Sequence, residues 1–238
     1  MCIIVSVVYF QLEYLMRMIA EELINDMVPA LTMKDDAEKA ILWMGELRTN
    51  FLPVIENSQF KGFISEDIIF ENNDLEKQIS MIKLIGDNCY LNKNQHFYDV
   101  IKLFKDFNID MVAILDDNDI YLGVVTIEDI MNAFSQTSAI QSPGGIIIIK
   151  LNLIDYSLSE VSRLIEENNA KILSTYIKSD PIETDKILLT IKINTSEISR
   201  IIATLERFGY TIIAQFKESP DKLEQMDRLD LLMKYINM

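Results

Sequence analysis

Residues 123–130 of the chain read GVVTIEDI: a glycine, two valines, a threonine, and then an acidic start to an apolar run. A closely similar stretch, GFISEDII, occupies residues 62–69. Each stretch follows a short apolar run, which reads NFLPVIE at 50–56 and DMVAILD at 110–116. Self-similarity at a fixed spacing is the signature of a repeated structural unit, so the sequence predicts two copies of one fold.

Both copies have the same order of predicted elements. A helix comes first in each, because apolar residues recur at helical spacing: Ala37, Ala40, Ile41 and Met44 in one copy, and Val100, Ile101 and Phe104 in the other. The short apolar strand follows, then a polar turn, a second strand that includes the glycine, and a closing helix. Neither copy can bury its sheet face alone, so the two are expected to pack together in an α+β fold.

The two β-α-β-β-α copies, a strand that contains proline (Leu52-Pro53-Val54) and the two glycine-led stretches resemble a tandem pair of cystathionine β-synthase (CBS) domains. We place this pair at residues 18–138, with copy one at 18–78 and copy two at 79–138. The resemblance implies a pseudo-twofold module whose clefts bind adenosine-containing ligands. It also implies that the Ser or Thr at the strand end contacts phosphate, and that the Asp three residues later binds the ribose hydroxyls.

In copy two, the residues that match this pattern are Thr126 and Asp129. A carboxylate can accept two hydrogen bonds from a ribose diol, and a hydroxyl can donate to a phosphate oxygen. The same residues also suit a helix N-terminus with Thr126 as the cap, and the sequence leaves both interpretations open. In copy one the site residues are Ser65 and Asp67, which are two positions apart, and Ile68 occupies the expected ribose position.

The charge of the predicted clefts disfavours a polyphosphate. Many nucleotide-binding CBS domains have His, Arg or Lys at the start of the second strand, whereas this chain has Asn50-Phe51 and Asp110-Met111 there. Asp110 and Glu128 would repel a polyphosphate. Arg48, Lys34 or a bound cation would have to compensate. We therefore expect weak ATP binding, a ligand with less negative charge, or no nucleotide; AMP, ADP, ATP and S-adenosylmethionine are the regulatory ligands considered, and no cofactor is required.

A second domain is predicted at residues 139–217, where the turn signal Ser142-Pro143-Gly144-Gly145 precedes six elements in the order βαββαβ. This is the ferredoxin-like plan. The order, with Asp155 at the end of the first strand, resembles an ACT domain, a regulatory module that often binds amino acids between paired domains. The family's ligand loop usually reads Asp-x-Pro-Gly, which residues 155–158 (DYSL) lack, so Asp155 and Ser157 are interpreted as a helix cap. An assembly role across a dimer does not need that loop.

The two ends of the chain lie outside these domains. Residues 1–17 are too short and too poor in basic residues for a signal peptide or a spanning helix, and we interpret them as an N-terminal extension. A membrane or partner anchor is the alternative. Residues 218–238 carry apolar residues at helical spacing, which predicts an amphipathic helix. It is expected to pack on its own domain or on a second subunit, or else to dock another protein.

The composition disfavours several classes of function. The chain has 238 residues and a net charge of −15 without a basic patch, so nucleic acid is an unfavourable partner. The two cysteines fit no metal or redox spacing, which is typical of a reducing, cytoplasmic compartment. A single histidine, with no Walker, dinucleotide or zinc motif, leaves no catalytic constellation and no zinc-type metal motif in the sequence, so no metal-site residue is assigned.

We therefore predict a cytoplasmic, non-enzymatic regulatory protein of the acetoin-utilisation type, the type that the CBS and ACT resemblances imply. A ligand in the copy-two cleft would favour one geometry of the CBS pair and thereby bias the ACT-like domain or an unknown regulated protein. The chain is expected to form a homodimer or a higher homo-oligomer and to contact no membrane. Two alternatives stay open: an assembly protein with vestigial clefts, and a Mg²⁺ sensor built on Asp110, Glu128 and Asp129.

Overall fold

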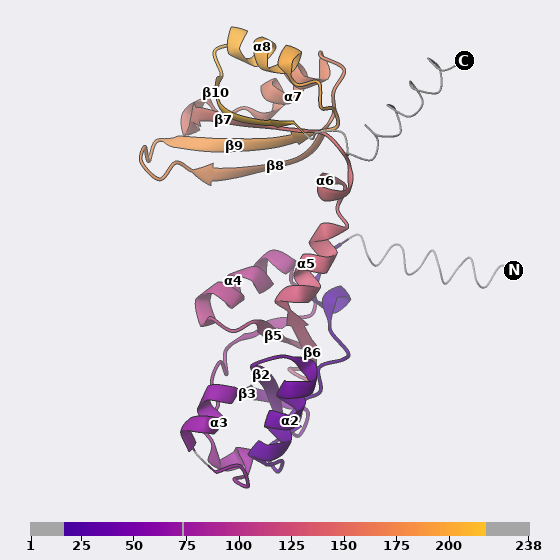
Figure 1. Ribbon diagram of the computed structural model, residues 1–238, viewed down its shortest axis with the longest axis vertical. Helices are drawn as coiled ribbons and strands as arrows, with labels where there is room; N and C mark the ends of the chain where they lie inside the picture. Colours follow the sequence, from indigo (N-terminus) through magenta and orange to yellow (C-terminus); the bar gives the residue numbers. More distant parts are fainter. Residues whose placement is uncertain (1–16, 73, 218–238) are drawn as a thin grey trace, which may run out of the picture. The chain divides into compact units, whose positions relative to one another are not determined.

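A computed structural model describes residues 17–72 and 74–217, and the chain divides into two units at residues 1–135 and 136–238 (Figure 1). The extension predicted at 1–17, except for Arg17, and the tail predicted at 218–238 lie outside the described residues. No helix within the described ranges is long and apolar enough to cross a membrane.

The first unit contains the two predicted copies, and their elements follow the same series. Copy one consists of η1 (Ala20–Leu23), β1 (Leu31–Thr32), α2 (Ala37–Leu47), β2 (Phe51–Glu56), β3 (Gln59–Ser65) and α3 (Glu66–Asn72). Copy two consists of η2 (Ile79–Met81), β4 (Tyr90–Asn92), α4 (Phe97–Phe107), β5 (Met111–Leu115), β6 (Tyr121–Thr126) and α5 (Ile127–Ser135). The first long helix of each copy begins at a side-chain cap, Asp36 or His96, and ends at a left-handed residue, Arg48 or Asn108. Such a left-handed residue is a common helix terminator.

Each copy forms a three-stranded sheet, β1-β2-β3 or β4-β5-β6, in which the first pair of strands is parallel and the second antiparallel. The segment that precedes the first strand of each copy pairs with the last strand of the other copy. The Asn25 amide donates to the Val124 carbonyl at 2.8 Å, and Phe63 and Ile85 exchange backbone hydrogen bonds of 2.7 and 2.9 Å. Phe63 of copy one is also fully buried in the apolar core of copy two. The two copies therefore interlock.

The repeated glycines lie where these exchanged segments cross the sheets. A Cβ atom on Gly62 would lie 2.9 Å from the carbonyl oxygen of Ile85, and a Cβ atom on Gly123 would lie 2.5 Å from Cγ2 of Ile24. Gly62 also has a φ of +135°, which side-chain-bearing residues rarely adopt. The glycine that marks the duplication in the sequence thus reflects the close approach of the other copy's chain.

The second unit is a βαββαβ domain. Its elements are α6 (Ser138–Gln141), β7 (Gly145–Asn152), η3 (Leu153–Asp155), α7 (Leu158–Glu166), β8 (Ile172–Ser179), β9 (Lys186–Ile193), α8 (Ser199–Arg207) and β10 (Thr211–Lys217). The sheet order is β10-β7-β9-β8 with every neighbouring pair antiparallel, and α7 and α8 cover one face (Figure 1). Alternate residues of β7 (Ile147, Ile149 and Leu151) are buried in the core beneath these helices. The predicted α+β fold class, a β-α-β-β-α pair followed by a ferredoxin-like domain, is confirmed.

Candidate functional site

A cleft of about 470 Å³ lies in the first unit beside the end of β6 and the start of α5. Residues of both copies line it: Asn25, Met27, Val28, Leu47, Arg48 and Thr49 from copy one, and Asp110, Met111, Thr126, Ile127 and Glu128 from copy two. The interlocked fold therefore surrounds the predicted site residue Thr126 with side chains that are distant in sequence.

Thr126 and Asp129 form a reciprocal cap at the start of α5. The amide and the hydroxyl of Thr126 donate to Oδ2 of Asp129 at 2.8 and 2.6 Å, and the Asp129 amide donates to Oγ1 of Thr126 at 3.2 Å. These bonds satisfy a backbone donor of the first helical turn, which has no partner within the helix. The structure thus brings the two residues together in the capping geometry. Thr126 lines the cleft, and Asp129, which is hydrogen-bonded to it, is not itself a lining residue.

Asn25 of copy one holds the Asp129 carboxylate from the other copy. The side-chain nitrogen of Asn25 lies 3.1 Å from Oδ1 and 3.2 Å from Oδ2. Oδ2 also accepts both groups of Thr126, so Oδ1 is the less occupied oxygen. A carboxylate oxygen can accept two hydrogen bonds, and Oδ1 therefore keeps capacity for a ligand hydroxyl. No local sequence pattern reveals Asn25 as a site residue, because its position depends on the exchange of segments between copies.

The corresponding residues of copy one do not form such a pair. Ser65 is buried, and its hydroxyl accepts the Ile68 amide at 3.3 Å as a helix cap. Asp67 lies in the first turn of α3, and no hydrogen bond joins it to Ser65. Ile68 stands where copy two has Asp129, so copy one offers no carboxylate at this place. Neither Ser65 nor Asp67 lines the cleft.

Three charged side chains line the cleft, and they do not neutralise one another. Arg48, at the left-handed end of α2 with a φ of 55°, forms no ion pair with any residue that the structure describes. Oδ1 of Asp110 is buried without a hydrogen-bond partner, and burial raises the pKa of this carboxyl group. Glu128 is exposed to solvent. Of the two cations that the sequence analysis named as compensating charges, Arg48 lines the cleft and Lys34 does not.

Within residues 17–72 and 74–217, no three His, Cys, Asp or Glu side chains converge closely enough to hold a metal ion. The acids considered for Mg²⁺, Asp110, Glu128 and Asp129, thus do not form such a group. Cys89 is buried, which raises its pKa to about 12, so its thiol stays protonated and unreactive at neutral pH.

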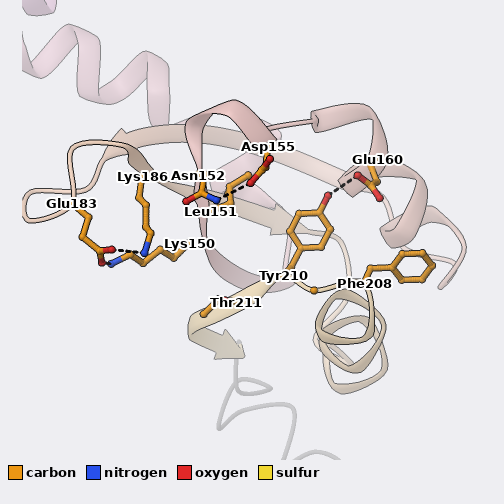
Figure 2. Close-up of a pocket in the computed structure, with 11 residues that line it drawn as sticks. Lys150, Leu151, Asn152, Asp155, Glu160, Glu183, Lys186, Phe208, Tyr210 and Thr211 are labelled. Atoms are coloured by element: carbon orange, nitrogen blue, oxygen red, sulfur yellow. Dashed lines mark hydrogen bonds and ion pairs between the residues drawn. The ribbon is translucent and has the colours of Figure 1, made fainter.

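A second pocket, of about 570 Å³, lies in the second unit at the end of β7 (Figure 2). Tyr210 at its wall donates its hydroxyl to Oε2 of Glu160 at 3.1 Å; burial and this bond raise the pKa of Tyr210 to about 12. Ser157 caps α7 by accepting the Glu160 amide at 3.4 Å, which confirms half of the predicted cap. The other half is wrong: Asp155 instead accepts the side-chain amide of Asn152 at 2.7 Å, because the η3 turn directs it back toward the strand end.

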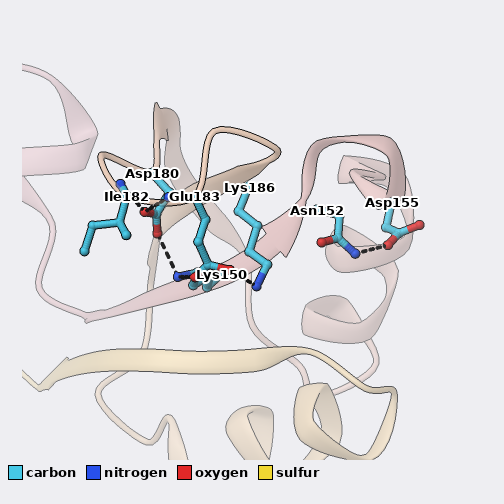
Figure 3. A network of polar contacts seen from close by, with 7 residues as sticks. All are labelled: Lys150, Asn152, Asp155, Asp180, Ile182, Glu183 and Lys186. Carbon is cyan, nitrogen blue, oxygen red and sulfur yellow. Dashed lines mark hydrogen bonds and ion pairs between the residues drawn. The ribbon is translucent and has the colours of Figure 1, made fainter.

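Ion pairs hold the hairpin between β8 and β9 against β7 (Figure 3). Lys150 on β7 lies 2.9 Å from Asp180 and also pairs with Glu183, which pairs in turn with Lys186. Hydrogen bonds from the Glu183 amide, from Lys150 and from the Ile182 amide lower the pKa of Asp180 to about 2. Both lysines of the pocket are thus engaged by acids of the same hairpin, which gives the network a structural role.

Comparison with known proteins relates copy two to a known family. The family model of the CBS domain matches residues 81–136. An uncharacterized protein of Methanocaldococcus jannaschii is 31% identical over 84 residues, which are 35% of this chain and 28% of that protein. The alignment therefore spans well under two thirds of that relative.

Similar solved structures include proteins described by their CBS domains. A CBS domain pair/ACT domain protein from Thermotoga maritima is 15% identical, with a TM-score of 0.45 and coverage of 49% of this chain and 96% of that chain. A CBS domain-containing protein of unknown function from Bacillus anthracis is 15% identical, with a TM-score of 0.43 and coverage of 50% and 93%. CBSX2, solved in complex with AMP, is 14% identical, with a TM-score of 0.43 and coverage of 50% and 96%.

Proposed function

We propose that this chain is a non-enzymatic regulatory protein that binds an adenosine-containing ligand in the cleft beside Thr126. The observation that carries this proposal is the cleft itself. It measures about 470 Å³, opens at a strand-to-helix junction within the segment that matches the CBS domain, and is lined by both copies. This volume falls in the range of small-molecule sites. AMP, ADP, ATP and S-adenosylmethionine are the candidate ligands.

Thr126 and Arg48 are the proposed donors to a ligand phosphate. The Thr126 hydroxyl donates to Asp129, and rotation of the side chain would redirect it to a phosphate oxygen. The bond of 2.8 Å from the Thr126 amide to Asp129 would persist and keep α5 capped. Asp129 does not itself line the cleft, but Asn25 does, and Oδ1 of Asp129 would accept a ribose hydroxyl in place of the Asn25 side-chain amide. Ser65 and Asp67, the weaker candidates of copy one, would contribute no second site of this design.

The regulatory output would be a shift between two geometries of the pair. A ligand that contacts Asn25 and Arg48 of copy one together with Thr126 of copy two binds best when the copies hold one relative position. We propose that this bias passes from residues 18–138 to the ACT-like domain at 139–217, or to a regulated protein. We also propose that the protein acts in the cytoplasm and forms a homodimer or higher homo-oligomer. Light scattering with and without ligand would measure the oligomeric state.

Thermal unfolding against a ligand panel tests the proposal. AMP, ADP, ATP and S-adenosylmethionine are added one at a time, because a ligand at 100 times its Kd stabilises the folded state by about 2.7 kcal/mol. Asp129→Ala should abolish the ligand-induced shift, while Asp67→Ala, which changes the same residue type in the first turn of α3, should keep it. The shift is compared rather than the absolute Tm, since loss of the cap alone costs about 1 kcal/mol. An unchanged shift in Asp129→Ala would remove the proposed site.

An assembly protein with vestigial clefts is the second candidate. It is favoured by the mutual bonding of Thr126, Asp129 and Asn25, which satisfies the proposed ligand groups without a ligand. It is also favoured by Ile68, which removes the carboxylate from copy one. This candidate predicts no stabilisation by any adenosine compound at millimolar concentration, together with an oligomer that is independent of ligand.

A further inference from the structure

We infer that the cleft selects adenosine ligands of low negative charge, such as AMP or S-adenosylmethionine, over ATP, and that Asp110 sets this selectivity. The inference rests on the proposed function. Asp110 directly precedes β5, and its carbonyl accepts the Ile127 amide at 3.0 Å. Asn50 holds the same place in copy one, where its carbonyl accepts the Glu66 amide at 3.0 Å. Asp110 therefore places a carboxylate beside the N-terminus of α5, where copy one has the neutral side-chain amide of Asn50.

The environment of Asp110 leaves its negative charge unneutralised. Oδ1 is buried and accepts no hydrogen bond, and no described Lys or Arg lies within ion-pair distance of the carboxylate. Arg48 lines the same cleft without pairing with it. Water screens a half-buried charge less than an exposed one, so the field of Asp110 reaches a ligand in the cleft more strongly than that of the exposed Glu128.

The phosphates of a bound ligand would lie at the end of β6, where the negative charge of Asp110 acts on them. Arg48 can offset about half of the negative charge of a single phosphate, and Thr126 can donate a hydrogen bond to it. Each further phosphate of ATP adds negative charge, and the lining residues of the cleft offer no second cation to meet it. The sulfonium and ammonium groups of S-adenosylmethionine would instead be attracted by Asp110. The cleft thus discriminates by charge at the group attached to the ribose, and the adenosine part is common to all ligands.

Isothermal titration with adenosine, AMP, ATP and S-adenosylmethionine tests the inference on the full chain. Asp110→Asn keeps the shape of the side chain and removes its charge. We expect it to raise the affinity for ATP relative to adenosine about tenfold, which corresponds to about 1.4 kcal/mol, and to weaken S-adenosylmethionine relative to adenosine. The matched control is Asn50→Asp, which places a carboxylate at the equivalent position of copy one; Asn50 follows the lining residue Thr49 but does not itself line the cleft, so this variant should leave both ratios unchanged.

The salt dependence of ligand affinity, measured on the wild-type protein, tests the inference without requiring that a variant folds. AMP and ATP share the contact with Arg48, and salt screens the repulsion of the further phosphates, so the affinity for ATP relative to AMP should rise with ionic strength. A fall with ionic strength, or an ATP-to-adenosine ratio that Asp110→Asn leaves unchanged, would overturn the inference while the proposed function stood. If no adenosine compound binds the wild-type protein or Asp110→Asn, the proposed function fails and the inference fails with it.

Discussion

Asn25 donates its side-chain amide to both oxygens of Asp129, at 3.1 and 3.2 Å, although the two residues belong to different copies of the repeat. The backbone of Asn25 is fixed at the same place, since its amide bonds to the Val124 carbonyl at 2.8 Å. The carboxylate that the CBS resemblance assigns to ribose is therefore oriented by the opposite copy. Any ligand that engages Asp129 acts on the contact between the copies as well as on α5.

Replacing Asn25 should weaken the first unit. Asn25→Ala removes the amide that joins the copies and leaves the part-buried Asp129 with fewer donors, so we expect a loss of about 1–2 kcal/mol in the free energy of unfolding. Urea denaturation measures it. Asn88→Ala is the control, because Asn88 contacts Asp87 on the exposed surface at 3.4 Å and should change the free energy by less than about 0.5 kcal/mol. Equal stability of the two variants would show that the contact between copies contributes little.

Two glycine-to-alanine substitutions should change the free energy of unfolding in opposite directions. Gly123→Ala places a Cβ atom 2.5 Å from Cγ2 of Ile24, so the exchanged segment must shift, and we expect a destabilisation of about 1–3 kcal/mol. Gly45 lies within α2, and a Cβ atom there meets nothing within 4 Å. Gly45→Ala should therefore stabilise the protein by about 0.5–1 kcal/mol. Thermal unfolding of both variants checks the pair; stabilisation by Gly123→Ala would contradict the described crossing of Ile24.

Much of this fold follows from the sequence because the signals are local. Apolar spacing and turn residues reveal the helices and strands of both copies, and the repeat of GFISEDII at 62–69 and GVVTIEDI at 123–130 reveals that the plan occurs twice. The βαββαβ order of the second unit follows from the same signals. The capping of α5 by Thr126 and Asp129 is also a local feature, since the two residues are three positions apart. The sequence predicts it as one of two roles for this pair, the other being ligand binding.

The rest of the site depends on contacts that no local pattern reports. Asn25 reaches Asp129 because the segment before β1 pairs with β6, and a pairing of this kind leaves no periodic trace in the sequence. Arg48 and Asp110 share the cleft for the same reason. Asp155 was misassigned to a helix cap because the sequence does not show that η3 turns it toward Asn152.

The ion pairs around Lys150 should make the second unit sensitive to acid. The pKa of Asp180 is lowered from its ordinary 3.8 to about 2 in the folded state, so its contribution to stability is present above about pH 4 and is lost as the pH falls from 3.8 toward 2. In Asp180→Asn, urea midpoints should therefore fall less steeply with pH over this interval. Asp185→Asn, on the same hairpin but outside the network, should keep the wild-type slope. The same slope in Asp180→Asn as in the wild type would contradict the account.

The thiol of Cys89 should be inert in the folded protein. Cys89 is buried and its pKa is raised to about 12, so little thiolate exists at neutral pH. In a Cys2→Ser background, labelling by a thiol-reactive reagent at pH 8 should require unfolding and should accelerate at the urea concentration where the first unit unfolds. Rapid labelling in native buffer would show that the core around Cys89 opens without global unfolding.

Amide NMR of the isotope-labelled protein during titration with AMP tests the central claim most directly, because it reports the location of binding and not only its occurrence. We predict that the amide signals of Asn25, Thr126 and Asp129 shift together and saturate, while those of Ser65 and Asp67 stay in place. In Asp129→Ala the shifts should be lost. Unmoved signals at millimolar AMP, or shifts that gather at residues outside the cleft, would contradict the claim that this cleft is the ligand site.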